Sequence, residues 1–306
     1  MITTLTGTNN FLIGQKLSQL TSKFAKQYGQ LAVEKLDGEE VEFERLNEAL
    51  TNLPFLIEKK LVVLRDPSKN KKFNENIEQI ISSIPDSTEV IIVESKIDKR
   101  QNYYKVIKKR TQYGELNELD GVELAKWLDE KVKNLGGTIS PIEAKYLINR
   151  LGTNQELLAN ELDKLLSYDK NITKETVDLL SEPSPQSSVF ELLDAAFSSD
   201  RRRILELYED QRQQGVEPQK IMAMIAWQLH VLAIIKAGGD KRADAVAKES
   251  KINPFVIRKS YTLAHKLSLF SLKKLIKQAL TLDITLKSQK IDADEALKHF
   301  LLSLSS

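Results

Sequence analysis

Patterns typical of strands and of helices alternate over the first 120 residues of this 306-residue chain, and this alternation restricts its fold more than any other feature. Aliphatic runs at 61–64 and 89–94 are typical of strands covered on both faces, and the β-branched segment 2–6 is a third strand pattern. A weaker strand pattern occurs at 31–33. Helical spacing of apolar residues separates these runs at 10–28, 43–53, 73–81 and 103–109. Such alternation indicates βαβ units, so we predict an α/β N-terminal domain with a parallel sheet.

From about residue 119 onward only helical spacing remains, so the rest of the chain is predicted to be all α. A segment rich in proline and serine at 182–188 is the clearest linker pattern in the sequence. A chain of 306 residues is also too long for a single core. We therefore predict three domains, an α/β domain over 1–120, a small helical domain over 121–183 and a larger helical domain over 187–306. The apolar pattern at 218–236 covers several helix faces, which predicts the central helix of the last domain.

An α/β domain of this type can bind nucleotide in its first turn, and the sequence there argues against it. A phosphate loop needs the spacing GxxxxGK[ST], in which the lysine and the hydroxyl hold phosphate and magnesium. After Gly7 the next glycine is Gly14, two positions late, followed by Gln15 where lysine is required, and neither Lys16 at the hydroxyl position nor Leu17 after it has a hydroxyl. We predict that the phosphate site is absent and that the chain needs no cofactor.

The composition excludes several other kinds of site. The chain has no cysteine, which excludes disulfides and thiolate metal sites, and its three histidines have no second ligand at metal spacing. Asp66 and Glu94 each follow a strand pattern alone, and no serine, histidine and acid constellation is present. We predict no catalytic residue and no metal site. Neither a signal peptide nor a membrane span is predicted, so we expect the chain in the cytoplasm.

Charge is distributed unevenly along the chain. Residues 201–306 contain 19 lysines and arginines against 11 aspartates and glutamates, which leaves 26 against 32 for the first 200 residues. A basic C-terminal third is compatible with a nucleic acid or an acidic protein as partner, although charge spread over helices is more often a solvated face.

The segment 53–57 is an apolar stretch at an element junction. Phe43, Leu46, Leu50 and Leu53 share one helix face, and Pro54 makes continuation of the helix beyond Leu53 unfavourable. Phe55, Leu56 and Ile57 then follow before the strand at 61–64. Two interpretations stay open, namely a small core folded back under the helix, or an exposed hydrophobic knob that marks a partner site.

Local matches in a fixed order along the chain resemble the delta subunit of the bacterial DNA polymerase III clamp loader. They cover nearly the whole chain and include the degenerate first turn. The other matching segments are Pro54 to Leu61, Lys96 to Arg100, Trp127 ahead of Gly136, Asn160 to Leu165 ahead of Tyr168, Val189 to Leu192 with Asp194 and Ala195, and Gly215 to Pro218.

The resemblance implies a RecA-like, AAA+-type module without a working nucleotide site, a helical lid domain and a helical collar domain for oligomerisation. It implies a role in DNA replication within the DNA polymerase III holoenzyme, a DNA-directed DNA polymerase and nucleotidyltransferase, with no catalysis by this chain. The implied partners are the ring-shaped sliding beta clamp, which the family opens, the ATP-hydrolysing gamma and tau subunits, the delta prime subunit and primed DNA, without a membrane.

The resemblance also implies a site, because a hydrophobic pair near the end of the helix before the third strand enters a pocket on the clamp in that family. The matching positions are Phe55 and Leu56, whereas the family often has leucine followed by phenylalanine. Leu53 and Ile57 are therefore further candidates for the contact. Two other functions stay open, an active ATPase of the same architecture and a helical nucleic-acid-binding adaptor.

Overall fold

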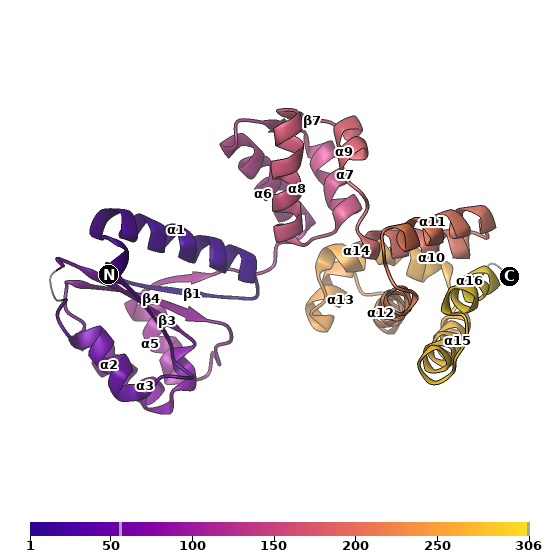
Figure 1. Cartoon of the computed structure of the whole chain (residues 1–306). Coiled ribbons are helices and arrows are strands. Elements are labelled where there is room, and N and C mark those ends of the chain that lie inside the picture. The colour runs from indigo at the N-terminus through magenta and orange to yellow at the C-terminus, as the bar shows by residue number, and fades with distance from the viewer. Residues whose placement is uncertain (55–56, 305–306) are drawn as a thin grey trace. The chain divides into compact units, whose positions relative to one another are not determined.

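In the computed structural model, which describes residues 1–54 and 57–304, the chain forms two compact units, Met1–Leu119 and Asp120–Ser306 (Figure 1). The first unit contains the α/β part and the second contains the helical part. The further predicted division of the helical part, between residues 183 and 187, stays a prediction.

A five-stranded parallel sheet forms the centre of the first unit. Its strands lie in the order β2-β3-β4-β1-β5, and every adjacent pair is parallel. The strands are β1 (Ile2–Thr6), β2 (Val33–Asp37), β3 (Lys60–Arg65), β4 (Thr88–Glu94) and β5 (Gln112–Glu115). This arrangement confirms the predicted α/β domain with a parallel sheet.

Helices cover both faces of the sheet, which explains the continuous aliphatic runs of β3 and β4. In β3, Leu61 and Val63 pack in the cluster that α1 (Asn10–Tyr28) supplies with Ile13 and Phe24. The alternate residues of β3 pack on the opposite face against the other helices, which lie together below the strands in Figure 1. Those helices are α2 (Phe43–Thr51), α3 (Lys71–Glu75), α4 (Ile77–Ser83) and α5 (Asn102–Arg110).

The prediction placed one edge strand, β2, too early and missed the other. Residues 30–32, of which 31–32 were expected in a strand, form a one-turn 3-10 helix, η1 (Gln30–Ala32), and β2 begins only at Val33. The strand β5 was missed entirely. Both edge strands contain polar residues, as in the Gln-Tyr-Gly-Glu sequence of β5, because part of their surface faces solvent. Such strands lack the aliphatic run that identifies a buried strand.

The second unit begins with four helices and one short strand pair. The helices are α6 (Gly121–Asn134), α7 (Pro141–Leu151), α8 (Gln155–Tyr168) and α9 (Lys174–Leu180). Ser140 caps α7 and Pro141 is its first residue, as the sequence predicted. The strands β6 (Thr138–Ile139) and β7 (Asn171–Ile172) pair in parallel, so this part is not purely helical. Strands of two residues leave no periodic signal in a sequence.

Seven helices complete the second unit. They are α10 (Pro185–Phe197), α11 (Arg201–Gln213), α12 (Pro218–Ala237), α13 (Ala243–Ser250), α14 (Pro254–Lys266), α15 (Leu269–Ser288) and α16 (Ala293–Ser303). The linker predicted at 182–188 is shorter than expected, because Ser184 caps α10 and Pro185 opens it. A serine followed by proline starts a helix as readily as it marks a loop.

The helix α12 is central to this bundle, as predicted. Nine of its residues are buried, among them Ile221, Met222, Ile225 and Leu232, which belong to one apolar cluster that α10–α16 share. By length and composition alone, α12 is also the one helix among the described residues that is apolar enough to cross a membrane. Its burial in the cluster accounts for that composition.

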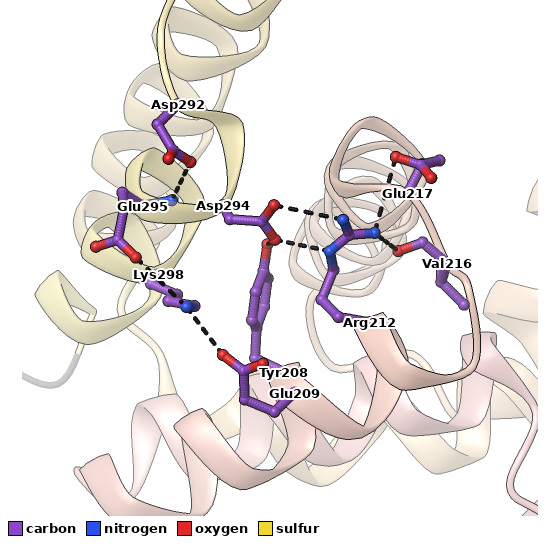
Figure 2. A network of polar contacts seen from close by, with 9 residues as sticks. All are labelled: Tyr208, Glu209, Arg212, Val216, Glu217, Asp292, Asp294, Glu295 and Lys298. Atoms are coloured by element: carbon purple, nitrogen blue, oxygen red, sulfur yellow. Dashed lines mark hydrogen bonds and ion pairs between the residues drawn. The ribbon is translucent and has the colours of Figure 1, made fainter.

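A polar network fixes the last helix of the chain to α11 (Figure 2). The Arg212 guanidinium contacts the Asp294 carboxylate with an Nε to Oδ1 distance of 2.7 Å, and the Tyr208 hydroxyl donates to the same oxygen at 2.8 Å. Burial raises the pKa of Asp294, but these two partners outweigh it, and the pKa lies below its usual value. Asp294 stands in the first turn of α16, where the helix dipole also favours a carboxylate.

Candidate functional site

The helix α2 ends earlier than predicted, and Leu53 does not share its buried face. Leu46 and Leu50 are buried, but the helix stops at Thr51 and Asn52 is already extended. Pro54 explains this end, because the residue before proline is pushed out of the helical region. Leu53 is consequently 74% exposed. An apolar side chain thus projects into solvent just before the segment that the sequence singled out.

Three candidates remain, and the structure describes one of them. Phe55 and Leu56 lie outside the described residues. Ile57 is half-buried and packs against the cluster that contains Ala32 and Leu61. This contact fixes the segment that leads into β3. Of the four candidates, the structure therefore shows one exposed residue and one that contacts the core.

The first strand-to-helix turn, where a nucleotide would bind in such a fold, is short. Only residues 7–9 separate β1 from α1, and Asn9 caps the helix by accepting a hydrogen bond from the Leu12 amide. Gly14 lies inside α1 rather than in a loop. Three residues are too few to wrap around a phosphate as the eight-residue phosphate loop does.

The backbone amides of this turn are already used. Thr8 N donates to Asn117 Oδ1 at 3.3 Å, and Asn9 N donates to the Leu116 carbonyl at 3.0 Å. Gly7 has a φ of 129°, and a Cβ there would lie 1.9 Å from the Leu116 oxygen, so only glycine fits. The segment that follows β5 thus packs on the turn and occupies its hydrogen-bond donors. No local sequence pattern indicates this closure, since the contacts join residues more than 100 positions apart.

We predict that the isolated chain does not bind ATP, because a phosphate would have to displace these hydrogen bonds without a lysine or a hydroxyl to replace them. Calorimetric titration with Mg-ATP should give no binding heat at millimolar nucleotide concentration. Binding in the micromolar range that is lost on Lys16→Ala would contradict the prediction.

A buried carboxylate, Glu94, ends β4 at the carboxyl edge of the sheet, where ligands bind in open α/β sheets. Three donors from the chain itself satisfy it, namely the Ser68 amide at 3.0 Å, the Ser68 hydroxyl at 2.7 Å and the Tyr103 hydroxyl at 2.6 Å. Burial raises the pKa of Glu94, and the hydrogen bonds oppose that rise without cancelling it.

The neighbouring carboxylate, Asp66, is also engaged. It accepts hydrogen bonds from the Ser95 amide at 2.7 Å and the Ser95 hydroxyl at 3.0 Å, and Lys69 lies 3.5 Å from it. Within 1–54 and 57–304, no group of three or more histidine, aspartate or glutamate side chains is placed to hold a metal ion. The acids at this edge therefore act as structural links between loops.

We predict that Glu94→Gln changes the pH dependence of stability. A raised pKa means that the folded state holds the Glu94 proton more tightly, so wild-type stability falls as pH rises from the unfolded pKa through the folded one. The glutamine variant lacks this loss, so its stability relative to wild type should increase with pH in urea unfolding from pH 4 to pH 8.

The matched control is Glu94→Ala. It leaves the buried Tyr103 hydroxyl without its acceptor, so relative to Glu94→Gln it should be less stable by about 1–3 kcal/mol at every pH. A difference between wild type and Glu94→Gln that does not vary with pH would show that Glu94 is not the titrating group.

Comparison with known protein families gives matches at both ends of the chain and in its middle. The model described as DNA polymerase III, delta subunit, matches residues 4–117, and the model of the C-terminal domain of the DNA polymerase III delta subunit matches residues 186–304. A third model, described as a middle domain, matches residues 122–179.

A curated sequence and a solved structure, both from Bacillus subtilis, are similar over most of the chain. The curated DNA polymerase III subunit delta of strain 168 is 26% identical over 284 residues, which cover 87% of this chain and 82% of that protein. The solved structure of the B. subtilis DNA clamp loader delta protein has a TM-score of 0.80 at 24% identity, and the match covers 99% of this chain and 95% of that one. This structural likeness shows that the two chains share the fold.

Proposed function

This chain belongs to the DNA polymerase III delta subunit family, a clamp loader component in DNA replication, and on this premise we propose that it binds the sliding beta clamp and opens it. The observation that carries the proposal is the exposure of Leu53, two positions before the candidate pair Phe55 and Leu56. A large apolar side chain exposed to water contributes nothing to folding stability. Its burial in an apolar pocket of a partner contributes favourable binding free energy.

We propose that the opening requires no hydrolysis by this chain. A ligand shifts an equilibrium only by its differential affinity for the two states. If the site 53–57 binds a deformed clamp interface more tightly than a closed one, binding itself favours the open ring. In this proposal the gamma and tau subunits hydrolyse ATP, and this chain has no catalytic activity of its own. The hydrogen bonds that occupy the backbone amides of the first turn support it.

We also propose that α10–α16 form the collar that joins this chain to the gamma, tau and delta prime subunits. Supporting this, the C-terminal family model begins at residue 186, next to the first residue of α10, and these helices share one apolar cluster. In this assignment the three parts are the clamp-binding module 1–120, the lid 121–183 and the collar 187–306. Primed DNA would be contacted in the assembled complex, and clamp opening would take place in the cytoplasm.

The experiment that tests the proposal is a direct binding measurement between the isolated chain and a purified sliding clamp. We expect binding without nucleotide, and we expect it to be unchanged by Mg-ATP. A helical nucleic-acid-binding adaptor would instead bind DNA with a strong salt dependence and leave the clamp alone. Absence of clamp binding in either condition would refute the proposal.

A further inference from the structure

Leu31 is the most exposed of the large hydrophobic residues that the structure describes. It is 99% exposed, compared with 74% for Leu53. Its neighbour Ala32 is 2% exposed and belongs to the cluster between α1 and the sheet. Leu31 is thus an apolar side chain held in water by a backbone that is anchored to the core.

The short connection between α1 and β2 holds the backbone of Leu31 in a defined position. The helix α1 ends at Tyr28, and its C-cap Gly29 has a φ of 91° that turns the chain. The 3-10 helix η1 then forms one turn, with Ala32 N donating to the Gly29 carbonyl at 3.3 Å. The strand β2 begins directly afterwards at Val33. A residue in so short a connection between two elements has little freedom, so ordering Leu31 against a partner would cost little backbone entropy.

Leu31 lies at the same edge of the sheet as the candidate site. The strands β2 and β3 are adjacent and parallel, and Val33 pairs with Leu61. The segments that lead into them therefore arrive at the same edge. Ile57, between the candidate pair and β3, packs against the apolar cluster that contains Ala32, as Val33 does, so both segments rest on one cluster.

We infer that Leu31 is a second apolar anchor for the sliding clamp, beside the site at 53–57. The inference rests on the proposed function and extends the clamp-binding site from the segment 53–57 to a surface that also includes Leu31. Leu31 is fully and Leu53 largely exposed, and the segments that carry them lead into the adjacent strands β2 and β3 at one end of the sheet, so we expect an apolar clamp surface to cover both. Neither side chain has a role in the core that would explain it.

The test compares clamp binding by full-length wild type, Leu31→Ala and Leu31→Met. Truncation to alanine should weaken binding about tenfold, the usual range for an anchor outside the centre of an interface. Methionine keeps the apolar volume and should keep binding close to wild type. The control is Leu179→Ala in α9, a leucine that is 66% exposed and belongs to the helical unit, and it should bind like wild type.

The melting temperature separates an interface role from a structural one. Leu31→Ala should melt within about 1 °C of wild type, since an exposed side chain contributes little to stability. If Leu31→Ala binds as well as wild type while Phe55→Ala, Leu56→Ala binds weakly, this inference fails and the proposed function stands. If wild type itself does not bind the clamp, both fail. A lower melting temperature for Leu31→Ala would identify a structural residue and also overturn the inference.

Discussion

The double change Phe55→Ala, Leu56→Ala is expected to weaken binding to the sliding clamp at least about a hundredfold, which corresponds to about 2.7 kcal/mol. The reason is the area that the pair can bury. A phenylalanine and a leucine together remove roughly 300 Å² of apolar surface from water, worth at most about 7 kcal/mol before ordering costs. Central anchors of this kind commonly cost about 2–4 kcal/mol each when truncated.

The same variant should melt at nearly the temperature of wild type. The melting temperature therefore distinguishes the two interpretations that the sequence left open for this segment. If the variant unfolds several degrees earlier and still binds the clamp, the pair belongs to the core. Leu53→Ala and Ile57→Ala complete the comparison, since Leu53 is exposed whereas Ile57 packs on the core. We expect Leu53→Ala to affect binding and Ile57→Ala to lower stability.

Removal of α10–α16 is expected to abolish assembly with the partner subunits, while a fragment of residues 183–306 should fold and assemble alone. The cluster shared by these helices is made of residues between Val189 and Leu304, so the fragment retains its entire apolar core. The contacts from Arg212 and Tyr208 to Asp294 also lie within it (Figure 2). A domain with its own core of this kind can fold independently.

The fragment should start at Pro183, because α10 begins with Ser184 as its cap and Pro185 as its first residue. A matched fragment of 187–306 lacks this cap and should be less stable by about 1 kcal/mol in urea unfolding. Co-purification with the partner subunits measures assembly for both fragments. Loss of assembly on deletion of residues 1–120, with the helices intact, would contradict the collar assignment.

Local patterns identified the three central strands of the sheet and most of the helices. The reason is that β3 and β4 are covered on both faces and are apolar over several consecutive residues, while β1 is rich in β-branched residues. Helix ends were predictable where a cap and a proline stand together, as at Ser140 and Pro141. The degenerate first turn was also visible, because the spacing of a phosphate loop is a local property.

Other features depend on contacts between distant segments, which no local pattern records. The polar edge strand β5 was missed, since an edge strand needs no aliphatic run. Whether a leucine near a strand faces water is decided by what packs next to it, so local patterning assigned Leu31 to a strand although it is 99% exposed. Closure of the first turn by Leu116 and Asn117 likewise arises only because β5 pairs with β1 and brings its end to that turn. Local sequence is thus enough to identify the covered strands and the helices. Which apolar and polar groups remain available to a partner depends on the fold, because their neighbours are remote along the chain.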